Sequence, residues 1–316
     1  GRLRWSFERD GEDEACFGLL SDEDQAGLEA LLAGPARWVA PRFSDVAPEG
    51  VGPFEADVLM PSPWQPTIEA ADMHAIGVDV GGSGCRIAVV NVDTGAVQGD
   101  VLSLAHDLST PAEAILANLR GALADHPSLP VGLGFPGLVE GTTVLGAPNL
   151  GSTWPGTDLA SALERPGLVL LNDADAAAVA EQRLGSSSSE EGCVLMVTVG
   201  TGLGSGVHRG GALVPGFELG LLPHPTRGGS LEAHASGRAR RLNGLDLAAW
   251  STRFNEALAV MEEAVSADLI VVGGGITEHW DAFVERLVAR APLRRATFGP
   301  NAGLIGAALM ARGFSA

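Results

Sequence analysis

Two glycine-rich segments, each between apolar stretches, contain residue types that bind phosphate. They hold glycines, hydroxyl residues and one arginine: Gly81, Gly82, Ser83, Gly84 and Arg86 in the first, and Thr198, Gly200, Thr201, Gly202 and Gly204 in the second. Glycine lets backbone N–H groups approach an anion closely, and hydroxyl and guanidinium groups donate further hydrogen bonds. A glycine hairpin is also an ordinary turn, so either segment alone leaves both interpretations open. Two such segments in one chain favour phosphate binding.

A third glycine cluster comprises Gly273, Gly274 and Gly275. It follows the apolar stretch 269–272 and precedes a predicted helix. Ligands of α/β proteins bind at the carboxyl ends of strands, so this cluster is a candidate donor-binding element. Close packing of a helix is the alternative.

Two aspartates stand where apolar stretches end. Asp79 precedes the first glycine segment, and Asp173 lies between the stretch 168–171 and an alanine-rich helix. Phosphoryl transfer to a hydroxyl needs one carboxylate to orient and deprotonate the acceptor, while a metal ion absorbs charge on the donor. Capping of the helix is the other role open to Asp173. Beside two phosphate-binding segments, we interpret Asp173 as a general base and Asp79 as a ligand that organises Mg²⁺ through water.

The composition excludes several classes of protein. The 316 residues are 46% hydrophobic, and the net charge of -19 argues against a broad nucleic-acid surface. Lysine is absent, which excludes lysine Schiff-base catalysis. Cys16, Cys85 and Cys193 are odd in number and widely spaced, so we expect reduced thiols. No membrane-length apolar run or signal peptide is apparent, and we expect a cytoplasmic protein without a membrane partner.

The pattern changes near residue 73. Residues 1–73 form an acidic extension of unknown role, with a short helix predicted over 22–32 and a proline-rich segment over 48–66. A docked appendage, a dimerisation element and a substrate gate all remain open for it. From there on, apolar segments predict six strands, and amphipathic spacing predicts helices over 111–124 and 247–265. The strands are expected over 76–80, 87–92, 131–135, 168–171, 194–199 and 269–272.

These elements indicate a duplicated α/β fold in which phosphate-facing turns meet across a cleft. We expect a small lobe over residues 74–171 and a large lobe over 172–300. A final helix within 301–316 is expected to cross back to the small lobe.

Seven motifs, in order, resemble those of the ROK sugar kinases, a family of the actin-like ATPase and hexokinase superfamily. The motifs begin at Asp79, Gly134, Asn172, Thr198, Gly216, Gly273 and Asn301. The resemblance implies a two-lobed actin-like ATPase fold of the duplicated ribonuclease H-like type. The relatives are commonly homodimers, so the resemblance also implies a homodimer here. Residues 152–156 and the Asp-Ala-Asp-Ala-Ala run at 173–177 look most like the polyphosphate glucokinases.

The resemblance also implies roles for single residues. Asp173 matches the general base that deprotonates the 6-hydroxyl of glucose or a related hexose. Contacts to sugar hydroxyls are implied for Gly137, Asn149, Asn172, Glu218 and Glu232. The phosphoryl donor is polyphosphate, ATP or both, with Mg²⁺ as cofactor. The glycine segments do not distinguish the two donors, because both present phosphate oxygens.

The sequence departs from the family at two places. A histidine that follows Glu218 in the family motif is replaced by Leu221, which leaves the sugar in doubt; His224, three residues on, is a possible substitute. Relatives often carry a cysteine cluster where this chain has residues 223–230 without cysteine, so we expect no structural zinc.

Arginines outside the glycine segments form two groups that are candidates for a polyphosphate track or for ordinary solvated charge. The groups are Arg238, Arg240 and Arg241 on a predicted helix, and Arg290, Arg294 and Arg295 near the end of the chain. Two other functions remain open. One is a kinase of another polyol, such as mannose, an amino sugar or a cyclitol. The other is a non-catalytic sugar-binding homologue; a repressor is disfavoured because residues 1–73 contain no basic recognition helix.

Overall fold

The computed structural model describes residues 2–9, 12–19, 73–148 and 150–313, with side chains from residue 73 onward. The chain divides into two compact units, residues 1–67 and 68–316, which are described separately. In the first, β1 (Arg2–Arg9) pairs antiparallel with β2 (Glu12–Leu19). The sequence-based expectations did not include this hairpin, although an Asp-Gly pair between alternating segments is a hairpin signal. The predictions for 22–32 and 48–66 lie outside the described residues.

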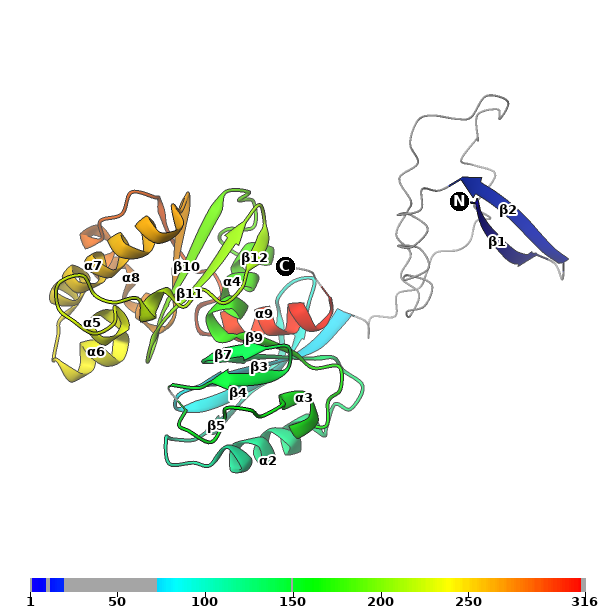
Figure 1. Ribbon diagram of the computed structural model, residues 1–316, viewed down its shortest axis with the longest axis horizontal. Helices are drawn as coiled ribbons and strands as arrows, with labels where there is room; N and C mark the ends of the chain where they lie inside the picture. The colour runs from blue at the N-terminus through cyan, green and yellow to red at the C-terminus, as the bar shows by residue number, and fades with distance from the viewer. Residues whose placement is uncertain (1, 10–11, 20–72, 149, 314–316) are drawn as a thin grey trace, which may run out of the picture. The chain divides into compact units, whose positions relative to one another are not determined.

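The second unit contains two five-stranded sheets with the same plan (Figure 1). In each sheet, the three strands that come first in the sequence form an antiparallel meander. A fourth strand pairs in parallel with the first strand, and a fifth pairs in parallel with the fourth. The orders are β5-β4-β3-β6-β9 and β12-β11-β10-β13-β14. This repetition confirms the duplicated α/β fold, and all six predicted strands are present.

The strand bounds are as follows. The first sheet comprises β3 (His74–Gly81), β4 (Gly84–Asn91), β5 (Val97–Ala105), β6 (Val131–Phe135) and β9 (Val169–Asn172). The second comprises β10 (Cys193–Val199), β11 (Leu203–Arg209), β12 (Ala212–Val214), β13 (Leu269–Gly273) and β14 (Leu293–Arg295). A separate hairpin pairs β7 (Leu138–Glu140) with β8 (Thr143–Gly146). The fully buried strands β6 and β13 are continuous apolar runs, as expected for parallel strands covered on both faces.

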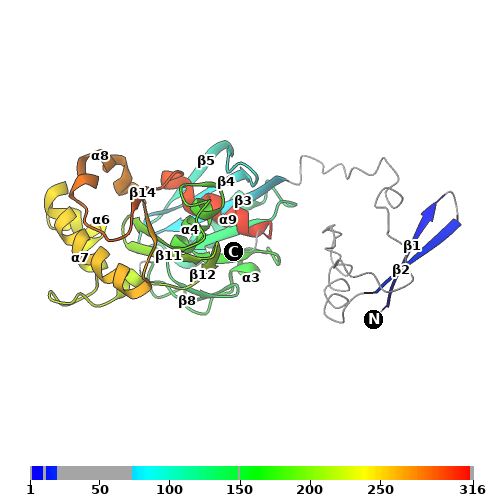
Figure 2. The ribbon, with the colours of Figure 1, turned by 90° about the horizontal axis from the view of Figure 1, so that it is seen from above.

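Two helices lie against each other between the sheets (Figures 1 and 2). The helix α9 (Ala302–Ala311) packs on β3 and β6, and α4 (Asp173–Leu184) packs on β10 and β11. Both helices are rich in alanine, and α9 also has glycine, so their backbones approach closely. The end of the chain therefore contributes to the core of the first sheet. The lobe boundaries expected at residues 74, 172 and 301 remain predictions.

One longer amphipathic helix packs against each sheet and contributes to the hydrophobic core there. The helix α2 (Ala112–Leu123) buries Ile115, Leu116 and Leu119 in the core of the first sheet. The helix α7 (Leu247–Val265) places Trp250 and Phe254 in the core of the second. Both helices were predicted from their apolar spacing.

The remaining helices are short. They are α3 (Leu159–Ala162), α5 (Glu232–Ala235), α6 (Gly237–Leu242), α8 (Trp280–Phe283) and 3-10 turns over Leu219–Leu221, Gly275–His279, Val284–Arg286 and Gly299–Asn301. None of the helices in the described ranges has the length and apolar character that crossing a membrane requires. Cys85 and Cys193 are buried free thiols.

Candidate active site

The first two glycine segments reach one cavity of about 390 Å³. Gly82 and Ser83 form the two-residue turn between β3 and β4, and Thr201 lies in the turn between β10 and β11. All three line the cavity, together with Leu108 and, from α6, Arg238, Arg241 and Leu242. The lining thus combines glycine backbone with hydroxyl and guanidinium side chains, residue types that suit an anion.

Other glycines of these segments lie at strand ends or in packing contacts. Gly81 and Gly84 close the first hairpin as a pair. A Cβ atom at Gly204 would come within 2.8 Å of the Ala174 Cβ on α4. In the third cluster, Gly274 has a φ of 80°, and a Cβ there would lie 2.5 Å from the Val199 carbonyl oxygen. Gly273 and Gly274 therefore pack against β10, whereas a Cβ at Gly275 would have no neighbouring atom within 4 Å. Phosphate contacts from this cluster stay a prediction.

Arg86 on β4 is engaged within the protein. Its guanidinium donates to the Pro300 carbonyl and to the Asn301 Oδ1, just before α9. Arg86 also lies opposite Asp79 in the β3–β4 pairing, where its charge lowers the pKa of that carboxyl. These contacts tie β4 to the C-terminal segment, and a contact of Arg86 with donor phosphate remains a prediction.

Asp79 and Asp173 are positioned by the parallel strands of the first sheet. In the register, Asp79 on β3 lies beside Gly134 on β6, and Phe135 on β6 lies beside Asn172 on β9. Asp173 follows at once as the first residue of α4. Both aspartates therefore stand at the carboxyl edge of this sheet, where α/β folds bind ligands.

Burial raises the pKa of both carboxyl groups, and neighbouring negative charges raise that of Asp173 further. Burial raises the pKa of Asp79 to about 6, against the opposing charge of Arg86. The pKa of Asp173 rises to about 7, first through burial and then through the charges of Asp79 and Glu218. A base with a pKa near neutrality matches what proton transfer at physiological pH requires.

Asn172 joins the start of α4 to the predicted sugar ligands. Its Oδ1 accepts hydrogen bonds from the backbone N–H groups of Ala174 (2.8 Å) and Asp175 (3.2 Å), so Asn172, not Asp173, is the N-cap of α4. Its Nδ2 donates to the Glu218 Oε1 at 2.8 Å and to the Gly137 carbonyl at 3.2 Å. The structure therefore brings together three of the predicted sugar ligands.

Glu218 and Glu232 extend this cluster of carboxylates. Burial, followed by the charge of Glu232, raises the pKa of Glu218. The Glu232 Oε2 accepts a hydrogen bond from the Leu203 N–H at 2.9 Å, beside the second glycine turn. Asn149, the remaining predicted sugar ligand, lies outside the described residues.

Asp175 belongs to the Asp-Ala-Asp-Ala-Ala run, and the sequence pattern assigned it no role. Its side chain is buried, its Oδ2 accepts from the Gly216 N–H at 2.9 Å, and its Oδ1 has no hydrogen-bond partner. Burial raises the pKa of Asp175 to about 7. This contact ties α4 to the loop that carries Glu218. An acid with alanine on both sides in a predicted helix was the available signal, because an unpaired carboxylate is seldom buried.

The carboxylates fit a magnesium ion held largely by water and substrate. Within the residues that the structure describes, no group of three or more His, Cys, Asp or Glu side chains is arranged as a metal site. Mg²⁺ is commonly bound through one or two carboxylates together with substrate phosphates. After burial, the negative charges of Asp79 and Glu218 raise the pKa of Asp173, and a bound cation would offset this repulsion.

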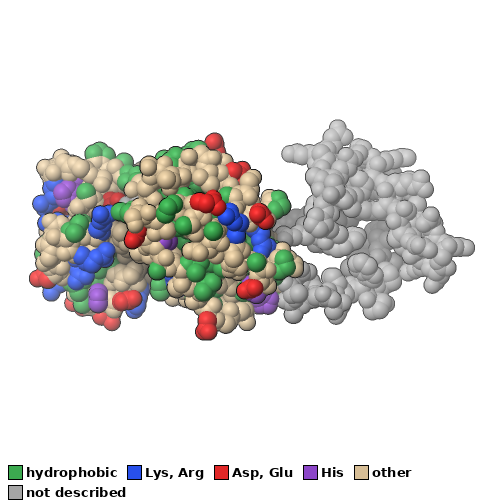
Figure 3. All heavy atoms as spheres, turned by 90° about the horizontal axis from the view of Figure 1, so that it is seen from below, with side chains coloured by type: hydrophobic (Ala, Val, Ile, Leu, Met, Phe, Trp, Pro, Cys, Tyr) green, Lys and Arg blue, Asp and Glu red, His purple; other side chains and the backbone are tan. Residues whose placement is uncertain are grey.

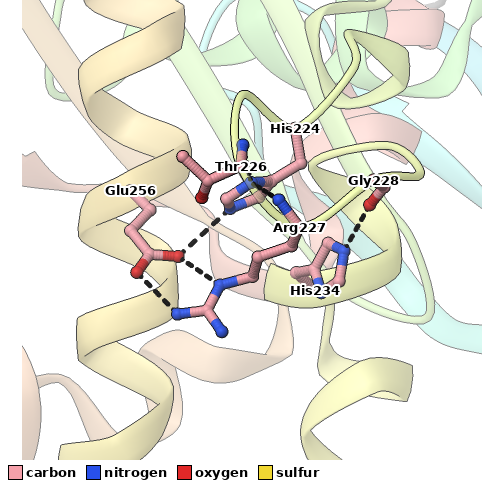
Figure 4. A network of polar contacts seen from close by, with 6 residues as sticks. All are labelled: His224, Thr226, Arg227, Gly228, His234 and Glu256. Atoms are coloured by element: carbon pink, nitrogen blue, oxygen red, sulfur yellow. Dashed lines mark hydrogen bonds and ion pairs between the residues drawn. The ribbon is translucent and has the colours of Figure 1, made fainter.

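The loop over residues 223–230 is held by an ion-pair network (Figure 4). Glu256 on α7 pairs with the Nε2 of the buried His224 at 3.1 Å and with the Nε and Nη2 of Arg227 at 2.8 and 2.7 Å. The His224 Nδ1 accepts from the backbone N–H groups of Thr226 and Arg227, so the ring proton is on Nε2. The ring of His234 on α5 packs edge-on against His224, and its Nε2 contacts the Gly228 carbonyl.

His224 therefore has both nitrogens engaged away from the sugar ligands and does not take the place of the missing family histidine. Leu221, at the end of a 3-10 helix, is 47% exposed. The network instead anchors the loop that leads into α5 and Glu232.

We expect Glu256→Ala to lower the free energy of unfolding by about 1 kcal/mol, since it removes charge-assisted hydrogen bonds at a partly exposed site. The Arg227 hydrogen bond holds the pKa of Glu256 at about 2. The difference from wild type is therefore present above the unfolded pKa of about 4.3 and disappears as the pH falls through about 2. Urea unfolding across this range measures it.

Glu113→Ala is the matched control, because Glu113 makes one exposed ion pair with Arg120. We expect it to change stability by less than about 0.5 kcal/mol. Equal effects of the two variants would contradict a structural role for the network.

Comparison with known proteins identifies the family. The ROK family model matches residues 75–226. The chain is 34% identical over 245 residues to the polyphosphate glucokinase of Mycobacterium tuberculosis (strain CDC 1551 / Oshkosh), covering 75% of this chain and 90% of that protein. The crystal structure of an inorganic polyphosphate/ATP-glucomannokinase from Arthrobacter sp. strain KM superposes with a TM-score of 0.70 at 32% identity, covering 75% and 98% of the two chains.

A ROK family glucokinase from Streptomyces griseus, solved in complex with glucose and AMPPNP, superposes with a TM-score of 0.63 at 26% identity. The match covers 76% of this chain and 99% of that chain. These matches extend over nearly the whole length of the relatives and place the chain in the actin-like ATPase fold. The family match, together with 34% identity to the Mycobacterium tuberculosis protein over 90% of its length, shows that the chain belongs to the ROK family.

Proposed function

We propose that the protein transfers a phosphoryl group from polyphosphate, ATP or both to the 6-hydroxyl of glucose or a related hexose. Its relatives over three quarters of the chain are sugar phosphotransferases, and the chain is an enzyme of this class. The observation that carries the finer proposal is the pair of aspartates, Asp79 and Asp173, at the carboxyl edge of a sheet whose first turn lines an anion-suited cavity.

In the proposed reaction, the Asp173 carboxylate accepts the proton of the sugar hydroxyl. The hydroxyl oxygen forms a bond to the terminal phosphorus, and the bond from that phosphorus to the rest of the donor breaks. The products are a sugar phosphate and a donor one phosphoryl group shorter. The pKa of Asp173, raised to about 7, makes the carboxylate a stronger base than an exposed aspartate.

Other residues bind and orient the reactants. Glu218, Asn172 and the Gly137 carbonyl form a polar surface for sugar hydroxyls, and Glu232 extends it. Gly82, Ser83 and Thr201 offer donors to phosphate oxygens. Asp79 would hold Mg²⁺ through water, and the bound ion would neutralise charge on the donor phosphates.

A matrix of donors and acceptors tests the proposal. Purified protein with Mg²⁺ is given polyphosphate or ATP with glucose, mannose, an amino sugar and a cyclitol, and sugar phosphate is measured. We expect turnover with glucose or another hexose and at least one donor. The absence of transfer in every combination would overturn the proposal, and calorimetry showing tight sugar binding without turnover would identify a non-catalytic homologue.

The acceptor panel is broad because Leu221 stands where family members have a sugar-binding histidine. An exposed leucine cannot make the hydrogen bond of that histidine, which leaves a related hexose as the second candidate substrate. The homodimer and the cytoplasmic location stay predictions.

A further inference from the structure

We propose that Arg238 and Arg241 of α6 form an anion-binding extension of the donor cavity that favours extended inorganic polyphosphate over a nucleotide. This inference rests on the proposed kinase function and concerns which phosphoryl donor the same site selects. Both arginines line the cavity that Gly82, Ser83 and Thr201 also line.

The helix α6 is fixed in position against the second glycine turn. The Ser236 Oγ accepts from the Ala239 N–H at 3.1 Å and caps the helix. A Cβ atom at Gly237 would lie 2.4 Å from the Gly200 carbonyl oxygen, so the two backbones are in direct contact. Arg238 and Arg241 are three residues apart, a spacing that places side chains on the same side of a helix. Both arginines therefore extend from a helix that is fixed beside the second glycine turn, and both line the same cavity as Thr201.

The other candidate arginines are placed differently. Arg240, between these two in sequence, does not line the cavity, and its Nε is buried. In the second group, Arg294 pairs with Glu190 at 2.7 Å and donates to the Ser186 carbonyl at 2.8 Å. The structure therefore distinguishes Arg238 and Arg241 from the other arginines of the two groups.

The charge of the cavity lining contrasts with that of the chain. The chain carries a net charge of -19, yet among the described residues that line this cavity there are two arginines and no carboxylate. The space-filling view shows basic side chains, interspersed with acidic ones, over the part of the second unit that carries α5 to α7 (Figure 3). A polyanion would be attracted to the basic lining of the cavity and repelled by the acidic side chains around it.

The apolar part of the lining is a poor fit for a purine ring. It consists of Leu108 and Leu242, whose exposed fractions are 57% and 77%, and no aromatic side chain lines the described part of the cavity. Small-molecule sites are usually enclosed by apolar and aromatic groups. A linear polyphosphate needs no such slot, and each added phosphate brings charge that a further guanidinium can contact.

The test compares donors in wild type, Arg238→Ala, Arg241→Ala and the double variant at saturating sugar. We expect the double variant to lose about 10- to 100-fold in kcat/KM for long-chain polyphosphate, as for two lost charge-assisted contacts. The kcat/KM for ATP should change by less than about threefold. In the double variant, the ratio of kcat/KM for long polyphosphate to kcat/KM for short polyphosphate should decrease. The dependence of the polyphosphate kcat/KM on salt concentration should decrease as well. Lysine at both positions should restore part of the polyphosphate activity, because it keeps the charge but not the planar fork.

Arg286→Ala is the control, since it removes the same charge from an exposed position outside the cavity lining. It should leave both donors unaffected. Thermal melting of each variant shows that it is folded. If the double variant lost kcat/KM equally for ATP and polyphosphate, or lost none for either donor, the inference would be overturned.

A binding measurement separates this inference from the proposed function. Calorimetry with long-chain polyphosphate needs no turnover. If wild type transfers no phosphate, the proposed function fails, but polyphosphate binding that the double variant loses would still support the anion site. Equal binding by both proteins would overturn the inference even if wild type is an active kinase.

Discussion

Replacing Asp173 by asparagine is expected to reduce kcat by about 10³-fold, the range found for loss of a general base. Asparagine has nearly the same shape but cannot accept the proton of the sugar hydroxyl. The cap of α4 remains, because it is made by Asn172. Sugar affinity measured by calorimetry should therefore change only a few-fold. Asp281→Asn, at an exposed position on α8, is the matched control and should retain full turnover.

The pH dependence gives this prediction a second readout. The pKa of Asp173 is about 7 in the folded protein and about 3.9 in the unfolded chain, so between these values only the folded state holds the proton. The contribution of Asp173 to stability, measured as the difference between wild type and the asparagine variant, should accordingly decrease as the pH rises from 4 to 7, while the kcat/KM of wild type increases through about 7.

The asparagine variant should lack this rise in kcat/KM. It should also be more stable than wild type at pH 8, because it no longer buries that negative charge. Full turnover, or an unchanged pH profile, would show that Asp173 is not the base. Asp79 and Asp175 titrate nearby, so the profile is that of a coupled group of carboxyls.

Alanine at Gly306 is expected to lower the free energy of unfolding by about 3 kcal/mol or more. A Cβ atom at this position in α9 would lie 1.7 Å from the Ala176 carbonyl oxygen on α4. The obstacle is helix backbone, which cannot move aside as a flexible side chain does, so α9 and α4 would have to separate. For a domain of this size, the melting temperature should fall by roughly 6 to 12 °C.

Gly121→Ala makes the same chemical change in another helix. Gly121 lies on α2, and a Cβ atom added there would have no neighbouring atom within 4 Å, so alanine should raise stability by about 0.5 to 1 kcal/mol. Opposite signs for the two substitutions would establish that the contact between α9 and α4, rather than glycine itself, matters. Similar small effects at both positions would refute it.

Much of the fold follows from local sequence patterns. Apolar runs ending in Asp79 or before Asp173 predicted strands whose carboxyl ends carry the candidate chemistry, and the repeated glycine segments predicted the duplication. The carboxyl edge could be inferred because a strand places its last residue at a defined position in a parallel sheet. Both aspartates accordingly lie where the sequence indicated.

The contacts that complete the site were beyond prediction because they join distant segments. The amide of Asn172 reaches Glu218, 46 residues later, and Arg86 reaches Asn301, 215 residues later. His224 was considered as a sugar ligand, but it lies in a loop and its side chain pairs with Glu256 on α7, 32 residues later. Residue types and spacing contain no information on such pairings until the elements are packed.

The position of α9 has a consequence for how the protein is made. This helix packs on β3 and β6 of the first sheet, which leave the ribosome much earlier. Until α9 has emerged, the nascent chain presents an uncovered apolar sheet face, a state prone to aggregation. We therefore expect folding of the first sheet to be completed only after residues 302–311 have left the ribosome, and chaperones to associate with the nascent chain until then.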